Sequence, residues 1–372
     1  MDTDAQHRLR ADWLAIQTAT RSRVSTQRIA AASSSGRLWL AFCDSLHQDP
    51  DALPTDAVPL LQIFAQRLRT GTLDSSRKPM RSRGVEDVVR AVGQAYAGLG
   101  SSDPRLNVHG HVDFRLASLY RAWAKADPAP SRVKPLPIIL LRQVVAMAHS
   151  ANCPLAKAEA DTLTIGVFFL LRPGEYVGRP DDKLDTLFRL RDLSLWIGSR
   201  ALDPLTCPLP DLQAATFASL TFTRQKNGVR GEKIGHGRSG DPHICPVLCL
   251  VARVIALRNL PCTPATPLNT YRATSGGPLQ YVLSADLTRR IRATLAVYPD
   301  PSYWSSDVSA RSTRAGGAMA LLCAGVTGER IKMIGRWKSD ELYRYLHVQA
   351  QPIMTGVAAA MLRGGSFRMA PG

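Results

Sequence analysis

The chain has 372 residues, of which 45% are hydrophobic and 21% are charged; this composition allows two domains with proper cores and excludes a disordered chain. A formal net charge of +17 and an isoelectric point near 10.0 favour an anionic partner, which is nucleic acid or another anionic surface such as a ribosome. No signal-peptide pattern opens the chain, and its longest apolar stretch, 165–171, is too short to cross a bilayer. Seven cysteines without repeated spacing favour reduced thiols in an intracellular protein.

The first third of the chain is predicted to be almost entirely helical. Apolar residues recur at helical spacing between breakers such as Pro50, Pro54, Gly71 and Pro104. The pattern therefore predicts a small helical bundle over residues 1–127. Its expected helices span residues 5–18, 27–46, 57–70, 85–99 and 114–125.

A basic segment, RKPMRSR, covers residues 77–83 and immediately precedes the fourth expected helix. Cations beside a helix N-terminus suit contacts with phosphate groups. Lys78, Arg81 and Arg83 are therefore candidates for binding nucleic acid. The alternative is a basic loop that faces water, as most charge runs do.

Residues 128–137, PAPSRVKPLP, are predicted to form a linker between two domains. Proline stiffens such a segment toward extended conformations, and neither a helical nor a strand pattern is present. Its cation Lys134 is a further candidate for contacts with nucleic acid.

After the linker, the pattern predicts helices over residues 138–149 and 156–171. Pro173 and Gly174 cannot continue the second helix, so Arg172 is expected at its end, with Glu175 three residues later to orient it. An arginine fixed in this way suits an anionic ligand. The alternative is a buried Arg–Glu pair that only locks a turn.

Extended structure is expected next, because residues 191–197 and 216–223 alternate between apolar and polar side chains. Lys226-Asn227-Gly228 follows, and Asn-Gly after an extended run predicts a β-hairpin. Lys226 would then lie at the hairpin tip, where a long cation can reach a bound ligand or can simply be solvated.

Two histidines and two cysteines occur close together in GHGRSGDPHICPVLC. Their spacing matches no common zinc pattern, and an apolar helix follows Pro246, so Cys245 and Cys249 are expected to be buried and no metal site is expected. Helices are predicted over 245–257 and 284–297.

The stretch 309–347 contains the arginines and tyrosines that are most able to bind and attack a phosphate group. One helix is predicted to begin near Arg314 and to end at Gly325, and another spans 327–334 before Gly335. A third begins at Ser339 and carries two tyrosines. Arginine binds two phosphate oxygens at once, and a tyrosine hydroxyl can form a covalent intermediate, so this stretch suggests attack on a phosphodiester.

The order of these motifs resembles the tyrosine recombinase (phage integrase-like) superfamily. LLRPGE is similar to its first arginine motif, RSTRAGGAMALLCAGV to its second, and IGRWKSDELYRYLHV to its third box and nucleophile. The GRWKS form resembles the variant of mobile elements of the Crypton and DIRS type. The resemblance implies a mainly α fold with a small antiparallel β-sheet: a helical core-binding (SAM-like) domain over 1–127, an α+β catalytic domain over 138–350, and a C-terminal helix and tail over 351–372.

The resemblance also implies roles for single residues. Arg172 and Arg314 would hold the scissile phosphate, Lys226 would protonate the leaving 5′ oxygen, and Tyr345 would be the nucleophile. Glu175 would support Arg172.

Three positions depart from the family pattern or leave a choice open. Arg311 stands where the family commonly has histidine, which keeps the charge but removes acid–base chemistry near neutral pH. Trp337 matches the third box through GRW, whereas counting nine residues back from Tyr345 gives Arg336. Tyr343 is the alternative nucleophile.

The implied enzyme is a site-specific recombinase or integrase that needs neither metal nor another cofactor. Its implied partners are double-stranded DNA and three further copies of the chain, with a dimer on each of two sites and no membrane. We expect it to be intracellular and DNA-associated, in the nucleus of a eukaryote or the cytoplasm and nucleoid of a bacterium. The apolar stretch 352–363 would dock on a neighbouring subunit or on its own domain. A type IB topoisomerase-like enzyme and a catalytically inactive DNA-binding descendant are the alternatives.

Overall fold

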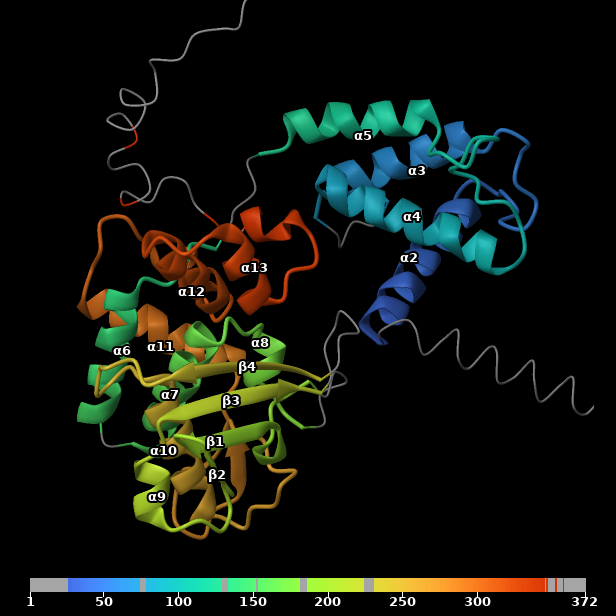
Figure 1. The fold of residues 1–372 in the computed structure, drawn as a ribbon. Coiled ribbons are helices and arrows are strands. Elements are labelled where there is room, and N and C mark those ends of the chain that lie inside the picture. The colour runs from blue at the N-terminus through green and yellow to red at the C-terminus, as the bar shows by residue number, and fades with distance from the viewer. Residues whose placement is uncertain are drawn as a thin grey trace, which may run out of the picture. The chain divides into compact units, whose positions relative to one another are not determined.

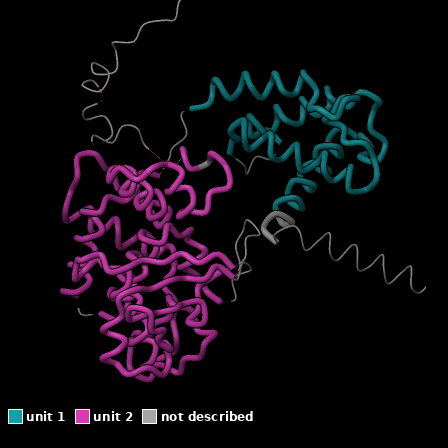
Figure 2. Tube along the Cα trace, in the orientation of Figure 1, with its two compact units in different colours: residues 1–130 teal, residues 131–372 magenta. Residues whose placement is uncertain are grey.

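The computed structural model describes residues 26–73, 78–128, 133–151, 153–180, 186–223 and 231–344, together with residues 346, 352 and 357. Contacts between residues divide the chain into two compact units, Met1–Pro130 and Ser131–Gly372 (Figure 2). The division lies within the segment 128–137 that the sequence predicts as a linker. The expected helix over 5–18, and the residues Lys226 and Tyr345, lie outside the described residues.

The first unit is a helical bundle (Figure 1). Apolar side chains from its helices meet in one core, in which Trp39, Phe42 and Phe64 pack ring against ring at centroid distances of 5.1–5.6 Å. The described helices lie where the sequence predicts them. They are α2 (Thr26–Asp44), α3 (Val58–Thr70), α4 (Ser82–Gly98) and α5 (Phe114–Ala126).

The second unit is built around α7 (Pro154–Phe168), which is largely buried because most of its residues are apolar or small, with Lys157, Glu159 and Asp161 as the charged exceptions. Helices α6, α10, α11 and α12 pack against it, as Figure 1 shows. The longer helices of this unit are α6 (Ile138–Ser150), α10 (Pro246–Arg258), α11 (Ser284–Val297), α12 (Ser312–Cys323) and α13 (Gly328–Gly335), and the short ones are α8 (Pro173–Tyr176), α9 (Leu209–Gln213) and the 3₁₀ turns η1 (Leu190–Asp192), η2 (Ser305–Asp307) and η3 (Asp340–Arg344).

One antiparallel sheet with strand order β2-β1-β3-β4 lies against α10 (Figure 1). Its strands are β1 (Leu193–Ile197), β2 (Arg200–Leu202), β3 (Phe217–Phe222) and β4 (Glu232–Gly237), and a separate pair is formed by β5 (Thr270–Arg272) and β6 (Leu279–Tyr281). Phe222 pairs with Glu232 at the end of the β3–β4 ladder, which confirms the predicted hairpin. The three-residue strands β2, β5 and β6 were not predicted, because so short a segment shows no alternation.

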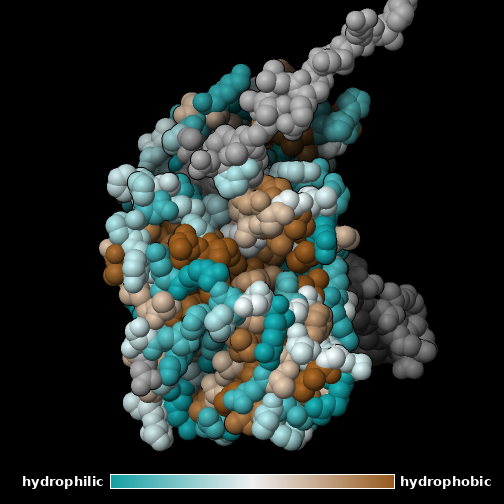
Figure 3. Space-filling model, turned by 60° about the vertical axis from the view of Figure 1, so that its left-hand side comes forward, coloured by the Kyte–Doolittle hydropathy of each residue, from teal (hydrophilic) through white to brown (hydrophobic). Residues whose placement is uncertain are grey.

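The described architecture confirms the predicted fold class, mainly α with a small antiparallel sheet. Within the part of the chain that the structure describes, no helix is both long and apolar enough to span a membrane. On the face shown in Figure 3, apolar and polar side chains lie in small interspersed patches. Ile139, Val297 and Tyr298 are among the exposed apolar residues of the second unit.

Candidate functional site

The candidate site begins at the turn that follows α7. The sequence predicts a helix up to residue 171, but α7 ends at Phe168, because Leu170 adopts the left-handed backbone conformation with φ of 49°. This conformation ends the helix and leaves the carbonyl groups of Phe169 and Leu170 available to side chains from elsewhere in the unit. Arg172 then stands at the N-cap of α8.

Glu175 holds Arg172 in two ways. The backbone N–H of Arg172 donates to Oε2 of Glu175 at 2.8 Å, and its Nη1 donates to Oε1 at 3.2 Å. The Glu175 side chain is buried, whereas that of Arg172 is 26% exposed. The sequence-based hypothesis that Glu175 orients Arg172 therefore agrees with these contacts, and Arg172 still reaches the surface.

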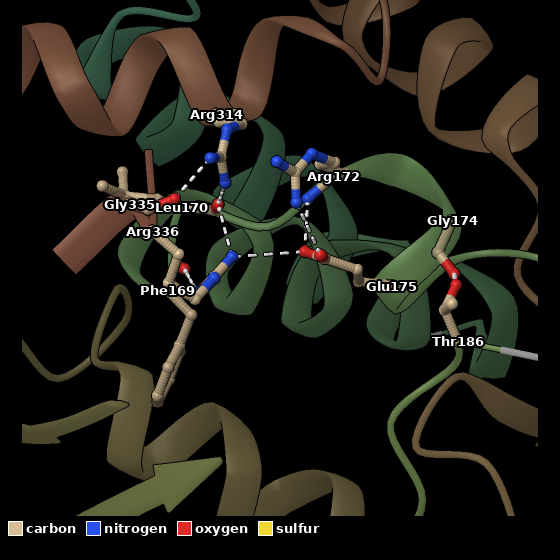
Figure 4. Close-up of polar contacts among 9 residues, drawn as sticks. All are labelled: Phe169, Leu170, Arg172, Gly174, Glu175, Thr186, Arg314, Gly335 and Arg336. Carbon is tan, nitrogen blue, oxygen red and sulfur yellow. Dashed lines mark hydrogen bonds and ion pairs between the residues drawn. The ribbon is translucent and has the colours of Figure 1, made fainter. Parts of the chain in front are cut away.

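Arg314 lies on α12 and is 2% exposed. Its Nη1 donates to the carbonyl oxygen of Leu170 and its Nη2 to that of Gly335, as Figure 4 shows. The guanidinium carbon also lies 4.0 Å from the centroid of the Trp337 ring, which is a cation–π contact.

Two glycines allow α12 to come this close. A β-carbon on Gly316 would collide with the Leu136 carbonyl oxygen, and one on Gly317 would collide with the Val167 carbonyl oxygen and the Leu170 side chain. The backbone of α12 therefore lies directly against the chain before α6 and the end of α7. Two consecutive glycines in RAGGAM indicate that the helix backbone comes close to another segment. The sequence does not indicate which segment that is.

Arg336 is a third arginine of the same cluster. Its Nη1 donates to the Phe169 carbonyl oxygen at 3.3 Å, and its Nη2 donates to the Leu170 carbonyl oxygen at 3.2 Å and to Glu175 Oε2 at 3.3 Å. Its guanidinium carbon lies 3.7 Å from the centroid of the Phe222 ring. Burial lowers the pKa of Arg336 to about 10, although Glu175 opposes this shift.

Arg336 and Trp337 both belong to the site, in different positions. Arg336 follows α13 in the left-handed conformation, with φ of 57°, and its guanidinium lies between the turn and the sheet. The Trp337 ring lies beside Arg314. The sequence left open which of the two fills the third-box position, and the structure buries both within the cluster.

The cluster has an excess of positive charge. Three guanidinium groups (Arg172, Arg314 and Arg336) and one carboxylate (Glu175) give a net charge of 3 − 1 = +2 in a largely buried place (Figure 4). Among the described residues, Glu175 is the one carboxylate in direct contact with them, and Glu232 acts on Arg336 from farther away. Buried charge of one sign is costly unless a counter-charge is supplied, so the arrangement suits an anion that approaches the exposed edge of Arg172.

Three other predicted site residues that the structure describes, Arg311, Tyr343 and Lys134, lie outside this cluster. Arg311 is exposed at the N-cap of α12, and Tyr343 in η3 is 61% exposed. Lys134 forms an ion pair with Asp307 at 2.8 Å. Lys226 and Tyr345 lie outside the described residues.

The basic segment of the first unit differs from expectation in one respect. The N-terminus of α4 does not face an open phosphate site, because the Ser82 N–H donates to Asp127 Oδ2 at 2.8 Å. Hydrogen bonds from Ser82, with a further contribution from Arg69, lower the pKa of Asp127 to about 2. Lys78, Arg81 and Arg83 are nevertheless exposed.

The histidine- and cysteine-rich segment packs into the second unit. Cys245 and Cys249 are buried, as predicted, and His236 lies edge-on to the ring of Phe169 with centroids 4.7 Å apart. In the described ranges, no three or more His, Cys, Asp or Glu side chains lie together as metal ligands would.

No protein-family model matches the chain, and no curated protein sequence does so either. Solved structures do match. The integrase of the Tn1549 transposon, in complex with transposon right-end DNA, is 14% identical, with 95% of this chain and 98% of that chain covered and a TM-score of 0.50. The XerA recombinase is 14% identical over 95% of this chain and 97% of that one with a TM-score of 0.36, and the XerH site-specific recombinase bound to its difH substrate is 12% identical over 88% and 96% with a TM-score of 0.39.

The likeness to the Tn1549 integrase shows the fold. It extends over nearly the whole of both chains, so it includes the helical first unit as well as the unit that holds the arginine cluster. The chain therefore has the fold of this integrase, in agreement with the fold that the three sequence motifs predicted.

Proposed function

We propose that the protein is a site-specific DNA recombinase or integrase that cuts and rejoins DNA through a 3′-phosphotyrosyl intermediate. The observation that carries this proposal is the cluster of Arg172, Arg314 and Arg336 beside the carboxylate of Glu175, in a chain with an integrase fold. A phosphodiester that is being cleaved gains negative charge on its non-bridging oxygens, and fixed guanidinium groups stabilise that charge.

Arg172 and Arg314 are the proposed phosphate ligands. Arg172 is partly exposed and oriented by Glu175, so it needs little rearrangement to meet a phosphate. Arg314 lies deeper, where its charge acts in a medium of low polarity. Each such donor contributes roughly a hundredfold or more to the rate in comparable sites.

We assign supporting roles to Arg336 and Trp337. Both Nη atoms of Arg336 donate to carbonyl oxygens or to Glu175, so we assign it an indirect role in which its charge supports Arg172 and Arg314. Trp337 lies beside Arg314 and restricts where that guanidinium can point.

In the proposed reaction the Tyr345 hydroxyl attacks the phosphorus and loses its proton to water. The bond from phosphorus to the 5′ oxygen breaks, and Lys226 donates a proton to that oxygen and regains one from solvent. The products are a 3′-phosphotyrosyl bond and a free 5′ hydroxyl. Attack by a 5′ hydroxyl of another strand reverses these steps and releases the tyrosine, so one phosphodiester replaces another at nearly equal energy.

Arg311 would contribute charge and not proton transfer. It is exposed at the start of α12, three residues before Arg314. A guanidinium stays protonated at every physiological pH, so Arg311 can contact a phosphate oxygen but cannot act as a general base.

The proposed substrate is double-stranded DNA, with a dimer on each site and a tetramer on two sites. Support comes from the net charge of +17 and from the Tn1549 integrase, whose structure was solved in complex with DNA. Lys78, Arg81 and Arg83 are the proposed phosphate contacts of the first unit, since all three are exposed.

A nicked suicide substrate tests the proposal. Cleavage near the nick releases a short strand, which traps the covalent adduct for detection on a denaturing gel. We expect an adduct with the wild type and with Tyr343→Phe but none with Tyr345→Phe. An adduct lost only in Tyr343→Phe would identify Tyr343 as the nucleophile. If no adduct forms on DNA that the protein binds, the result would favour a catalytically inactive descendant.

A further inference from the structure

Each residue of the segment Lys134–Leu136, here called the linker strap, forms a hydrogen bond with another part of the second unit. The Lys134 N–H donates to the Asp307 carbonyl oxygen at 2.7 Å. Lys134 Nζ forms an ion pair with Asp307 Oδ2 at 2.8 Å and donates to the Ser302 carbonyl oxygen at 2.7 Å. The Pro135 carbonyl oxygen accepts a hydrogen bond from the Tyr303 hydroxyl at 2.9 Å.

The last residue of the strap lies against α12. The Leu136 N–H donates to the Ser312 carbonyl oxygen at 3.0 Å, and the Leu136 side chain is buried. Gly316 lies so close to the Leu136 backbone that no β-carbon would fit. These contacts fall on either side of Arg314, two residues before it and two residues after it.

Asp307 is itself held in place. Its Oδ2 accepts a hydrogen bond from the Trp304 N–H at 2.9 Å, which closes the 3₁₀ turn η2. The hydrogen bond from Lys134 is the main cause that lowers the pKa of Asp307. The ion pair therefore joins two segments that are each fixed at a second point.

The first unit ends in a similarly fixed residue, Asp127, whose carboxylate binds Ser82 and Arg69 of that unit. The chain between the two anchored residues is then 128–133.

We propose that the linker strap positions the candidate site: Lys134, Asp307 and Gly316 hold the first turns of α12, and through them Arg311 and Arg314. The inference rests on the proposed function, since it concerns the same arginines. It gives Lys134 a role different from the DNA contact that the sequence suggests, because its ammonium group already has a carboxylate and a carbonyl partner.

A double-mutant cycle tests the role of the strap. Lys134→Met, Asp307→Asn and the double variant are compared with Lys125→Met, which removes the same charge from an exposed position of α5. The readouts are the single-turnover rate of adduct formation on the suicide substrate, and the DNA dissociation constant as a function of salt.

We expect each single strap variant to slow adduct formation by about tenfold to a hundredfold, because small displacements of catalytic groups have effects of this size. The double variant should be no slower than the slower single variant, as for two residues acting through one contact. Lys134→Arg should restore most of the rate. DNA affinity and its salt dependence should change no more than in Lys125→Met.

A different pattern would overturn the inference. If Lys134 contacts DNA, Lys134→Met reduces the salt slope by about one, while Asp307→Asn leaves the rate unchanged and strengthens binding. If the wild type forms no adduct, the proposed function fails. Amide hydrogen exchange of Asp307→Asn and wild type then tests separately whether the strap holds α12. Faster exchange at Leu136 and in the first turn of α12 in Asp307→Asn would support it, and unchanged exchange would refute it.

Discussion

At the scale of single residues, the candidate site depends on two backbone conformations that side chains rarely adopt. Leu170 and Arg336 both have positive φ, at 49° and 57°, and such positions cost about 1–3 kcal/mol each. The Leu170 carbonyl oxygen accepts hydrogen bonds from both Arg314 and Arg336. The strain is therefore offset by charge-assisted hydrogen bonds, each of which is stronger than a neutral one.

Arg336→Met should destabilise the second unit by roughly 3 kcal/mol, because it leaves the buried Phe169 and Leu170 carbonyl groups with fewer donors and removes one of the two arginines paired with Glu175. Arg330→Met, an exposed change on α13, should alter stability by less than about 0.5 kcal/mol. Denaturant unfolding of the two variants measures the difference. Equal stabilities would mean that Arg336 does not hold the turn.

Gly335→Ala should displace the Trp337 ring, because a β-carbon there would collide with three atoms of the indole. The same substitution at Gly328, at the start of α13, meets no atom within 4 Å and should stabilise the protein by about 0.4–1 kcal/mol. Tryptophan fluorescence and thermal unfolding would report both effects. A Gly335→Ala protein as stable as the Gly328→Ala protein would contradict the described packing of Trp337.

At the scale of elements, hydrophobic periodicity with proline and glycine breakers was sufficient to predict the long helices. It failed at the end of α7, since Phe169, Leu170 and Leu171 continue the apolar pattern although the helix has ended at Phe168. All three are buried. Periodicity reports burial, and a buried turn has the same pattern as a buried helix.

The site was predictable only in part, for a related reason. Arg172, Glu175 and Arg314 occur in recognisable motifs, and the structure brings them into one cluster. The part played by the Phe169 and Leu170 carbonyl groups was not predictable, because backbone oxygens leave no signature in a sequence. The same holds for the strap, whose lysine is indistinguishable in sequence from a solvated one.

The interface between α7 and α10 gives a prediction for pH. Burial raises the pKa of Asp161 on α7 to about 6 from 3.8, against the opposing effect of Arg253 on α10. Because the folded-state pKa is the higher one, the stability from the protonated form is fully present below 3.8 and is lost as pH rises through about 6. Relative to wild type, Asp161→Asn should gain about 1.4 kcal/mol between about pH 5 and pH 8, measured by urea unfolding. A difference independent of pH would contradict the burial of this carboxyl group.

At the scale of the whole molecule, the net charge of +17 predicts strongly salt-dependent DNA binding. If six to ten phosphates are contacted, the binding constant should fall by about 10³–10⁵ between 50 and 200 mM salt. Lys78→Ala should reduce the logarithmic slope by about one, as expected for a single phosphate contact. Fluorescence anisotropy titrations at several salt concentrations would measure both quantities, and a flat dependence would argue against a phosphate-based interface.

The arrangement of the chain in two units gives the strap its significance. Each unit has its own core, so under the proposed function DNA bound by one unit would influence the other through the linker or through the DNA itself. Because Lys134–Leu136 contacts the helix that carries Arg314, a displacement of the linker would act directly on the candidate site.

The central claim is that the arginine cluster neutralises a scissile phosphate, and a substrate with an uncharged phosphorus centre tests it most directly. Adduct formation by wild type and Arg172→Ala is compared on suicide substrates that carry either the normal phosphate or a methylphosphonate at the cleavage position. We predict a loss of about a hundredfold or more for Arg172→Ala on the phosphate and a loss below about tenfold on the methylphosphonate, which carries one negative charge fewer than the phosphate throughout the reaction. An equal loss on both substrates would contradict the account, since Arg172 would then be acting on something other than the charge of the phosphate.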